Sequence, residues 1–351
     1  MSDTRSRALA VLFALSPALT APLDAQAERH TLQGTDIAVY NLAGVIRVEP
    51  TGGPAVVVDV TRGGSDAGRL RVVTGDLRGR QTLRVLYPAD EIAYGEGHSS
   101  SELRVREDGT FGDNGDAWRD GRRVRITSRG GGLDAHADLR VGVPKGQRIA
   151  VYLGVGRAFV TNVDGQLRVD VASADVTAEK TRGPLTIDTG SGNVTATDAE
   201  GELSIDTGSG DVTVTRMRGP GLRIDTGSGN ATASQVEADV LDVDTGSGDV
   251  DATGVRARTI HLDTGSGNVE LAVLADADRI DIDTGSGNVT LVIPESFGAE
   301  VDVETGSGDI DLGFPVQARR LERDHFVGTI GDGRGSVTIG TGSGGVRLLK
   351  S

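Results

Sequence analysis

The chain has 351 residues, of which 52 are glycine and only 3% are aromatic, and it contains no cysteine. Scarce aromatic residues argue against a large globular core, because Phe, Tyr and Trp bury the most area per residue. The absence of cysteine excludes disulfides and thiolate metal sites. The formal net charge of −15 argues against nucleic acid or anionic lipid as a partner.

The N-terminus has the features of a secretory signal peptide. Arg5 and Arg7 precede an apolar run over residues 8–15, and a small-x-small cleavage motif ends at Ala27. Because this run is too short to cross a membrane, we predict a signal peptide over residues 1–27 rather than a span. No later stretch approaches the ~20 apolar residues of a spanning helix. The mature protein is therefore expected to be exported, to the periplasm or to the cell surface or extracellular space.

The region that follows the signal peptide has strand-like runs without a fixed repeat, such as residues 55–60 and 83–87. The stretch at about 90–132 is rich in Gly, Ser, Asp and Arg, contains the only tryptophan, Trp118, and is predicted to be a loop insertion. We assign residues 28–150 to a β-rich N-terminal cap, because the open end of a stacked repeat exposes unpaired strand edges.

A pentapeptide, DTGSG, recurs down the second half of the chain. It stands intact at 188–192, 206–210, 225–229, 244–248, 263–267 and 283–287, and it recurs as ETGSG at 304–308 and GTGSG at 340–344. Successive copies start 18 to 21 residues apart, except for a last gap of 36 residues, which we interpret as a skipped period near residue 322. A fixed period near 20 predicts a solenoid. We assign it to residues 151–351, with an irregular segment at about 314–336.

Side-chain alternation within one repeat predicts two short strands joined at the Gly-Ser-Gly turn. Leu185 and Ile187 share one face before the turn, and Val194 and Ala196 share one face after it. A further apolar position recurs every 19 residues, at Met217, Val236, Val255 and Leu274. Glycine closes the turn because it tolerates a positive φ. The fold class expected is all-β, a parallel β-solenoid (β-helix) with rungs of about 18–20 residues.

Stacking of the repeats would align their acidic residues in two outward columns. One column contains the Asp of each DTGSG, and the other contains the Asn or Asp that follows each turn. Like charges about 4.8 Å apart cost about 1 kcal/mol per pair in water, so hydrogen bonds from turn amides or a bound cation must offset the repulsion. Ca²⁺ suits such oxygen ligands. The calcium candidates are Asp188, Asp206, Asp211, Asp225, Asp244, Asp249, Asp263, Asp283 and Asp309.

The second column also has a purely structural interpretation. Its residues alternate between Asn and Asp over the first five rungs, and their side chains can accept hydrogen bonds from turn amides without any metal. The calcium solenoids with a G-G-x-G-x-D-x-U-x repeat have a different motif. The sequence leaves open whether these columns hold a cation.

The same motif resembles the active-site signature of aspartic proteases, but the chemistry does not follow. Two carboxylates must face each other to share a proton, whereas parallel stacking places these aspartates in one line. The five histidines are scattered, without metal-ligand spacing, and no histidine column accompanies the turn serines. We therefore predict no catalytic residues. A carbohydrate-active β-helix enzyme is the alternative, although aromatic residues that could bind sugars are nearly absent from the repeats.

The order of these features resembles a known family. A leader, a strand-rich start, a Pro-Lys-Gly turn at 144–146 and tandem L-x-I-D-T-G-S-G-[ND]-V units are similar to the bacterial putative-adhesin family of β-strand-repeat proteins, a domain of unknown function. The resemblance covers roughly 35–350, except that the 90–132 insertion departs from it. It implies a β-solenoid, an extracytoplasmic location and no established catalytic residues.

The expected function is that of an exported, non-catalytic surface or envelope protein, structural or adhesin-like, which presents regular faces to a partner. The expected partner is an unknown protein or glycan of the cell envelope. The alternatives are the carbohydrate-active enzyme and a calcium-stabilised surface protein. No cofactor other than calcium is expected.

Overall fold

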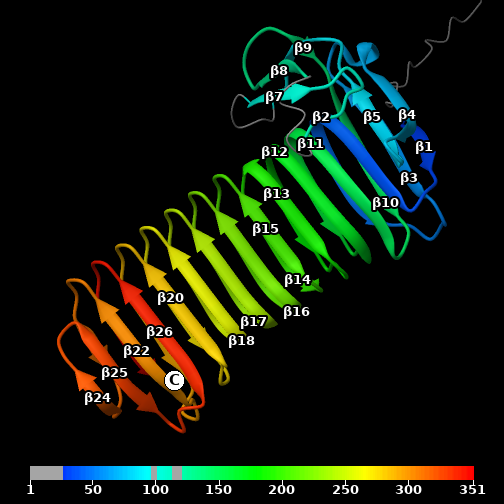
Figure 1. Ribbon diagram of the computed structural model, residues 1–351. Helices are drawn as coiled ribbons and strands as arrows, with labels where there is room; N and C mark the ends of the chain where they lie inside the picture. Colours follow the sequence, from blue (N-terminus) through cyan, green and yellow to red (C-terminus); the bar gives the residue numbers. More distant parts are fainter. Residues whose placement is uncertain (1–26, 96–100, 113–120) are drawn as a thin grey trace, which may run out of the picture.

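A computed structural model describes residues 27–95, 101–112 and 121–351 (Figure 1). The chain forms a long rod of stacked strands, coloured green to orange-red, with a broader β-rich end built from the blue and cyan segments. The all-β, parallel solenoid predicted from the repeat is confirmed. The expected signal peptide, except for Ala27, and Trp118 lie outside the described residues. No helix in the described part of the chain has the length and apolar character that a membrane crossing requires.

The strands before residue 145 build the broad end. In chain order they are β1 (Glu28–Leu32), β2 (Asp36–Pro50), β3 (Val56–Gly63), β4 (Arg71–Leu77), β5 (Arg80–Leu86), β6 (Glu91–Ala93), β7 (Ser101–Val105), β8 (Arg122–Thr127), β9 (Leu133–Asp134) and β10 (His136–Val143), with a short 3-10 helix η1 (Ala67–Arg69). The segment at about 90–132, expected to be a loop, includes strands β6, β7 and β8, which form a separate small sheet with β9.

The remaining strands build the rod. In chain order they are β11 (Gln147–Thr161), β12 (Gly165–Glu179), β13 (Leu185–Ser191), β14 (Val194–Glu200), β15 (Leu203–Thr207), β16 (Val212–Thr226), β17 (Ala231–Thr245), β18 (Val250–Thr264), β19 (Val269–Val273), β20 (Arg279–Thr284), β21 (Val289–Ile293), β22 (Ala299–Thr305), β23 (Ile310–Leu312), β24 (Gln317–Leu321), β25 (His325–Ile330), β26 (Gly335–Thr341) and β27 (Val346–Lys350).

Neighbouring rungs pair in parallel with equivalent residues opposite each other. Leu185 lies opposite Leu203, which in turn lies opposite Leu222. These leucines are at most 2% exposed, as expected from the alternation of apolar and polar residues. The core of the rod therefore consists of continuous columns of Leu, Ile, Val and Ala. The rod's stability comes from repeating one contact many times rather than from bulky aromatic packing.

The rung cross-section has a short third side. The apolar position predicted to recur there every 19 residues is buried for three residues and not for the fourth. Met217, Val236 and Val255 are buried there, but Leu274 is 50% exposed. Val273 takes the buried position instead, because the pairing of β18 with β19 shifts register between Thr253 and Val255. A one-residue shift turns a side chain from the core to the solvent.

The stack begins earlier in the chain than the repeat motif does. Strand β2, within the region assigned to the cap, pairs in parallel and in register with β11, so that Tyr40 lies opposite Tyr152. Strands β5, β10 and β3 then cover the outer side of this first rung. Strand β2 is thus both a rung of the rod and the platform for the end cap.

The C-terminal end departs from the sequence order. Strand β26 pairs with β20 on one side and with β22 on the other, and β27 lies in the same way between β21 and β23. The last repeat is therefore inserted between two earlier rungs. The prediction of a skipped rung near residue 322 is wrong, because β24 and β25 form an antiparallel hairpin there. Strand β25 also pairs antiparallel with β22 at the end of the rod.

Candidate functional site

The Gly-Ser-Gly corner requires glycine mainly because the rungs approach each other closely. A Cβ atom on Gly227 would lie 2.6 Å from the carbonyl oxygen of Gly208, although Gly227 itself has no positive φ. The second glycine of the motif, Gly229, has φ +155°, and its Cβ would lie 2.1 Å from the Gly210 oxygen. Both positions therefore exclude a side chain, the second also through its backbone conformation.

The threonine of DTGSG is buried at the corner, a role that we did not predict. It lies under the turn at every copy, at most 6% exposed. From the 225–229 copy onwards its hydroxyl donates to the carbonyl of the second glycine one rung away, as Thr264 Oγ1 does to Gly248 at 3.0 Å. The alternation Leu-x-Ile-x-Thr, which makes this position inward, was the signal that could have revealed it.

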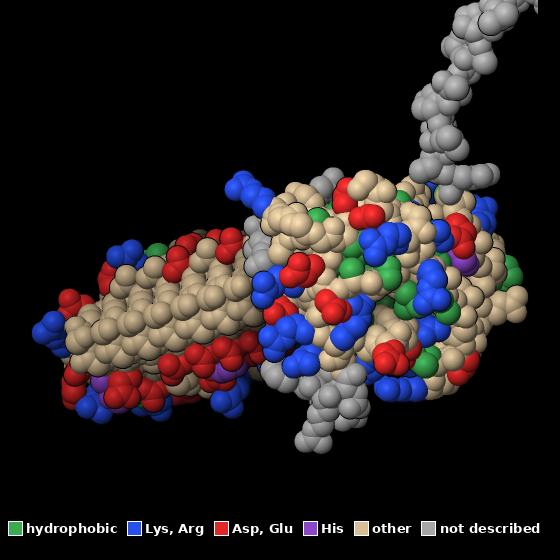
Figure 2. Space-filling model, turned by 90° about the horizontal axis from the view of Figure 1, so that it is seen from above, with side chains coloured by type: hydrophobic (Ala, Val, Ile, Leu, Met, Phe, Trp, Pro, Cys, Tyr) green, Lys and Arg blue, Asp and Glu red, His purple; other side chains and the backbone are tan. Residues whose placement is uncertain are grey.

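The aspartates of DTGSG form one outward column, which we call the aspartate column. Asp170, Asp188, Asp206, Asp225, Asp244, Asp263 and Asp283 lie opposite one another in register. Figure 2 shows a row of acidic side chains beside the tan band of Gly, Ser, Thr and backbone atoms that runs along the rod. The column was predicted correctly, and it brings together like charges from distant parts of the chain.

Burial and mutual repulsion both act on the carboxylates of the aspartate column. Partial burial and the carboxylates of Asp188 and Asp225 raise the pKa of Asp206. Partial burial and the carboxylates of Asp225 and Asp263 likewise raise the pKa of Asp244. Folding therefore disfavours the charged form of these two groups.

Arginines, rather than turn amides, provide the attractive contacts of this column. Arg168 Nη2 lies 3.4 Å from Asp188 Oδ2, and Arg223 Nη2 lies 3.5 Å from Asp225 Oδ2. The turn amides donate to backbone carbonyls of the neighbouring rung, as Gly208 N does to Thr189 O at 3.0 Å. We expected turn N–H groups to offset the repulsion between these aspartates. They instead donate to the backbone of the neighbouring rung.

The Asn and Asp residues after each turn form a second column, the Asx column, on the other side of the corner. Asp211 N donates to Asn193 Oδ1 at 3.0 Å, and Asn230 N donates to Asp211 Oδ1 at 2.9 Å. The same bond recurs at Asp249, Asn268 and further rungs. The structural interpretation is confirmed for the residues from Asn193 to Asn288, because one side-chain oxygen of each accepts the backbone amide of the next rung. Asp309 instead accepts from Arg323 Nε.

The calcium candidates therefore divide between two strands of each rung. Asp188, Asp206, Asp225, Asp244, Asp263 and Asp283 lie in the aspartate column, whereas Asp211, Asp249 and Asp309 lie in the Asx column. Over the described ranges, no group of three or more His, Asp or Glu side chains is arranged to hold a metal ion. Calcium binding stays a prediction.

A third column, which we call the ion-pair column, alternates in sign along the third side of the rung. It contains Asp164, Arg182, Glu200, Arg218, Glu237 and Arg256, in register. Arg182 Nε lies 3.1 Å from Glu200 Oε2, and Arg218 Nη2 lies 2.8 Å from Glu237 Oε2. The column forms one wall of an open groove over the buried side chains of Ala199, Met217 and Val236. We missed it because it becomes visible only once the rungs are aligned.

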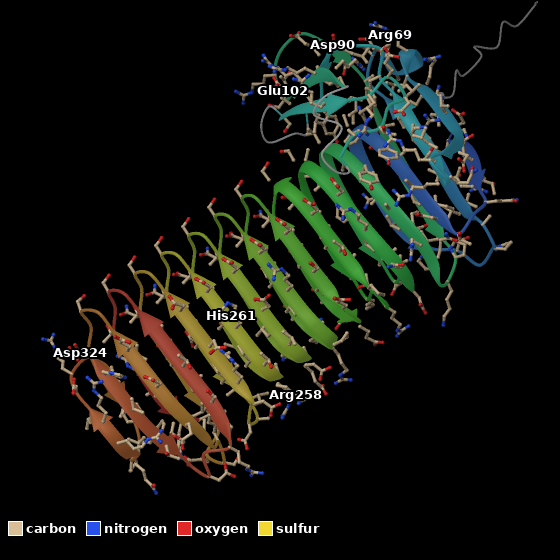
Figure 3. The ribbon with its side chains drawn as sticks, in the orientation of Figure 1. Arg69, Asp90, Glu102, Arg258, His261 and Asp324 are labelled. Atoms are coloured by element: carbon tan, nitrogen blue, oxygen red, sulfur yellow. The ribbon has the colours of Figure 1, made fainter. Side chains whose placement is uncertain are left out.

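Among the residues that the structure describes, the charged side chains outside these columns do not converge on a reaction centre. His261 projects outward from the middle of the rod, and Arg258 lies at its lower corner, where it pairs with Asp278 (Figure 3). His261 lies opposite Asp242 and Asp281 of the neighbouring rungs. The best-packed aromatic rings, Tyr40 and Tyr152, stack at 4.4 Å but are buried under the cap. The geometry offers charged surfaces rather than a nucleophile with a base.

Two solved structures show a general likeness. A putative cell adhesion protein from Clostridium sporogenes is 8% identical, with a TM-score of 0.21, over 93% of this chain and 100% of that one. A putative adhesin from Parabacteroides distasonis is 13% identical, with a TM-score of 0.42, over 92% of this chain and 96% of that one. We draw nothing from either beyond the likeness itself.

No curated protein matches the chain. The family described as Toastrack DUF4097 matches residues 135–349, which contain all the repeats, the corners and the three charged columns. This match confirms the resemblance seen in the repeat motif. The chain therefore belongs to the Toastrack DUF4097 family.

Proposed function

We propose that the protein is an exported, non-catalytic β-solenoid that acts in the cell envelope as a structural or adhesin-like element. Its aspartate column presents a regular acidic face to a partner, which is a protein or a glycan. The partner's contacting groups are cationic, or are bridged to the column by a divalent cation. The rod serves as the rigid support that spaces the carboxylates.

A contrast between two columns of the same rod carries this proposal. The ion-pair column alternates in sign, so each rung attracts its neighbours. The aspartate column keeps the same sign at seven successive positions, and partial burial together with these like charges raises the pKa of Asp206 and Asp244. Like charges in contact oppose stacking. Groups that oppose folding are characteristic of sites that serve binding instead.

The test is retention of envelope material by the immobilised mature protein. The variant D206N/D225N/D244N removes three charges from the aspartate column. The control D239N/D251N/E270Q removes the same charge from exposed positions elsewhere on the rod. We expect the first variant to lose binding in a salt-sensitive manner and the control to retain it. Equal binding by the unmodified protein, the first variant and the control would reject the aspartate column as the binding face.

Export is part of the same proposal and is tested separately. The leader over residues 1–27 should be absent from the mature protein. N-terminal sequencing of protein recovered from the periplasm or the cell surface should begin at residue 28. Recovery of the intact leader in the cytoplasm would contradict export.

Calcium is a second proposal, favoured by the repulsion within the aspartate column. If Ca²⁺ is bound between carboxylates, millimolar Ca²⁺ should raise the melting temperature and EGTA should lower it. An unchanged melting temperature would reject calcium binding.

An assay of reducing-sugar release from a panel of polysaccharides tests the proposal that the protein is non-catalytic. We expect no activity in this assay.

A further inference from the structure

The last repeat of the chain fills a slot between two earlier rungs. We call residues 335–350 the clip, and the space between β20–β21 and β22–β23 the slot. Within the clip, Val337 lies between Ile280 and Val301, and Val346 lies between Val289 and Ile310. The clip therefore has strand partners on both sides along both of its strands.

The clip is U-shaped, and both of its ends lie at one edge of the rod. At its start, Gly335 N donates to Gly298 O at 3.0 Å. At its end, Lys350 Nζ lies 3.3 Å from Glu295 Oε2, and Ser351 N donates to Ile293 O at 3.0 Å. Residues 293–298 are the linker that joins the two flanking rungs. Because this linker crosses only the open end of the U, the clip can leave or enter from the side of its Gly-Ser-Gly corner without being threaded.

The clip is neutral where it enters the aspartate column. The clip places Gly340 between Asp283 and Glu304, and Thr338 between Asp281 and Asp302. Direct stacking of the flanking rungs would bring each of these acidic pairs to about 4.8 Å. The motif of the clip, GTGSG, thus adds no further charge between the acids of the two flanking rungs.

The order of the chain makes the clip the last element that can be placed. Its slot is bounded by strands that end at Leu312, and the hairpin β24–β25 precedes it as well. The connection from β25 is short and largely exposed, and it contains two glycines in the left-handed region, Gly331 and Gly333. Until the clip enters, the slot is open to any clip of the same sequence.

We propose that the slot is a rung-accepting site whose ligand, besides the chain's own clip, is the clip of a second copy. Exchange between two copies preserves every strand pairing and every buried side chain of the clip, so only the connection at 331–334 must change course. Release of the clip without exchange would instead expose Val337, Ile339, Val346 and Leu348 to water. An exchanged dimer is therefore favoured over an open monomer.

Single cysteines in a chain that has none provide the test. D281C and T338C variants of the full chain are unfolded, mixed in equal amounts, refolded together and oxidised. Asp281 and Thr338 are outward partners across β20 and β26, at a separation that suits a disulfide. Exchange predicts a covalent heterodimer on a non-reducing gel, several-fold above background and increasing with protein concentration during refolding.

Two controls make the result decisive. T290C mixed with T338C gives the background, because Thr290 lies opposite Arg347 on the other strand of the clip. The double variant D281C/T338C should close its disulfide within one chain at low concentration, which shows that the clip occupies the slot. Closure within the chain, with heterodimer no higher than background at every concentration, would overturn exchange. Failure of the double variant to close would overturn the slot itself.

Discussion

Single residues of the repeat differ in how strictly the stack fixes them. The corner glycines are set by the carbonyl oxygens of the next rung, and the buried threonines from Thr226 onwards by a hydrogen bond to the corner of the neighbouring rung. The outward aspartates meet no such packing constraint, although Asp188 and Asp225 pair with Arg168 and Arg223. Geometry therefore explains the Thr and the two Gly of the motif as a corner, and we propose that the Asp before them serves binding.

Gly227→Ala should destabilise the rod by about 2–3 kcal/mol, because the new methyl group overpacks a rigid contact. The Cβ would lie 2.6 Å from the Gly208 oxygen. Gly221→Ala is the matched control, since its nearest neighbour, the Val240 oxygen, would lie 3.8 Å away. Urea unfolding of both variants checks the difference. Equal stabilities would show that the rungs at the corner are not in close contact.

The residues of the candidate site could be predicted because their positions follow from the spacing alone. Any stacking at the observed period aligns Asp206 with Asp225 and Asn193 with Asp211. The direction of their hydrogen bonds could not be predicted, because it depends on which neighbouring amide each oxygen reaches. The ion-pair column was missed for a similar reason: Glu200 and Arg218 are unremarkable until they lie opposite each other.

At the scale of elements, the sign pattern of a column decides whether neighbouring rungs attract. Arg218→Glu would place a third glutamate between Glu200 and Glu237, and we expect it to cost about 1–2 kcal/mol at low salt. Arg218→Gln should cost less, because it removes the attraction without adding repulsion. Thermal unfolding at low and high salt measures both. A loss as large for Gln as for Glu would mean that packing of the arginine stem, rather than charge, is what matters.

The same reasoning applies to the clip. Gly340→Asp would restore the DTGSG motif and place a third acid between Asp283 and Glu304, at a cost of about 1–2 kcal/mol. Gly340→Asn has nearly the same shape without the charge, and it should cost less. Urea unfolding followed near the C-terminal end checks the pair. If the Gly340→Asp variant were as stable as the Gly340→Asn variant, charge would not be the reason for glycine at this position.

The sequence was sufficient for most elements of the rod but not for the position of the last one. A gap of 36 residues fits a skipped rung and an inserted rung equally well, because periodicity records spacing and not spatial order. Gly340 was the local sign of insertion. The predicted burial of Leu274 was wrong for a different reason, since a one-residue shift in register beside a shortened strand cannot be predicted from the repeat period.

On the scale of the whole molecule, the acidic columns should give the protein an unusual pH dependence. Asp206 and Asp244 have a raised pKa in the folded state, so the folded protein binds protons before the unfolded chain does as the pH falls. Stability contributed by protonation therefore increases from neutral pH towards the ordinary aspartate pKa of about 4. Carboxylates whose pKa is lowered by arginine, such as Asp198 beside Arg216, lose their contribution only below that value.

We thus expect the melting temperature to increase as the pH falls from 7 towards about 4, then to fall at lower pH. The variant D206N/D244N should show a flatter profile over the upper range. Differential scanning calorimetry at constant ionic strength measures both profiles. A steady fall in the melting temperature from pH 7 downwards would contradict this assignment of repulsion.

The central claim is that the aspartate column opposes folding in the free protein and is retained for a partner. Its most direct test is the melting temperature of D206N/D225N/D244N against the unmodified protein, at neutral pH with a chelator present. We predict a higher melting temperature for the variant, because three mutually repelling charges are removed. An unchanged or lower melting temperature would contradict it.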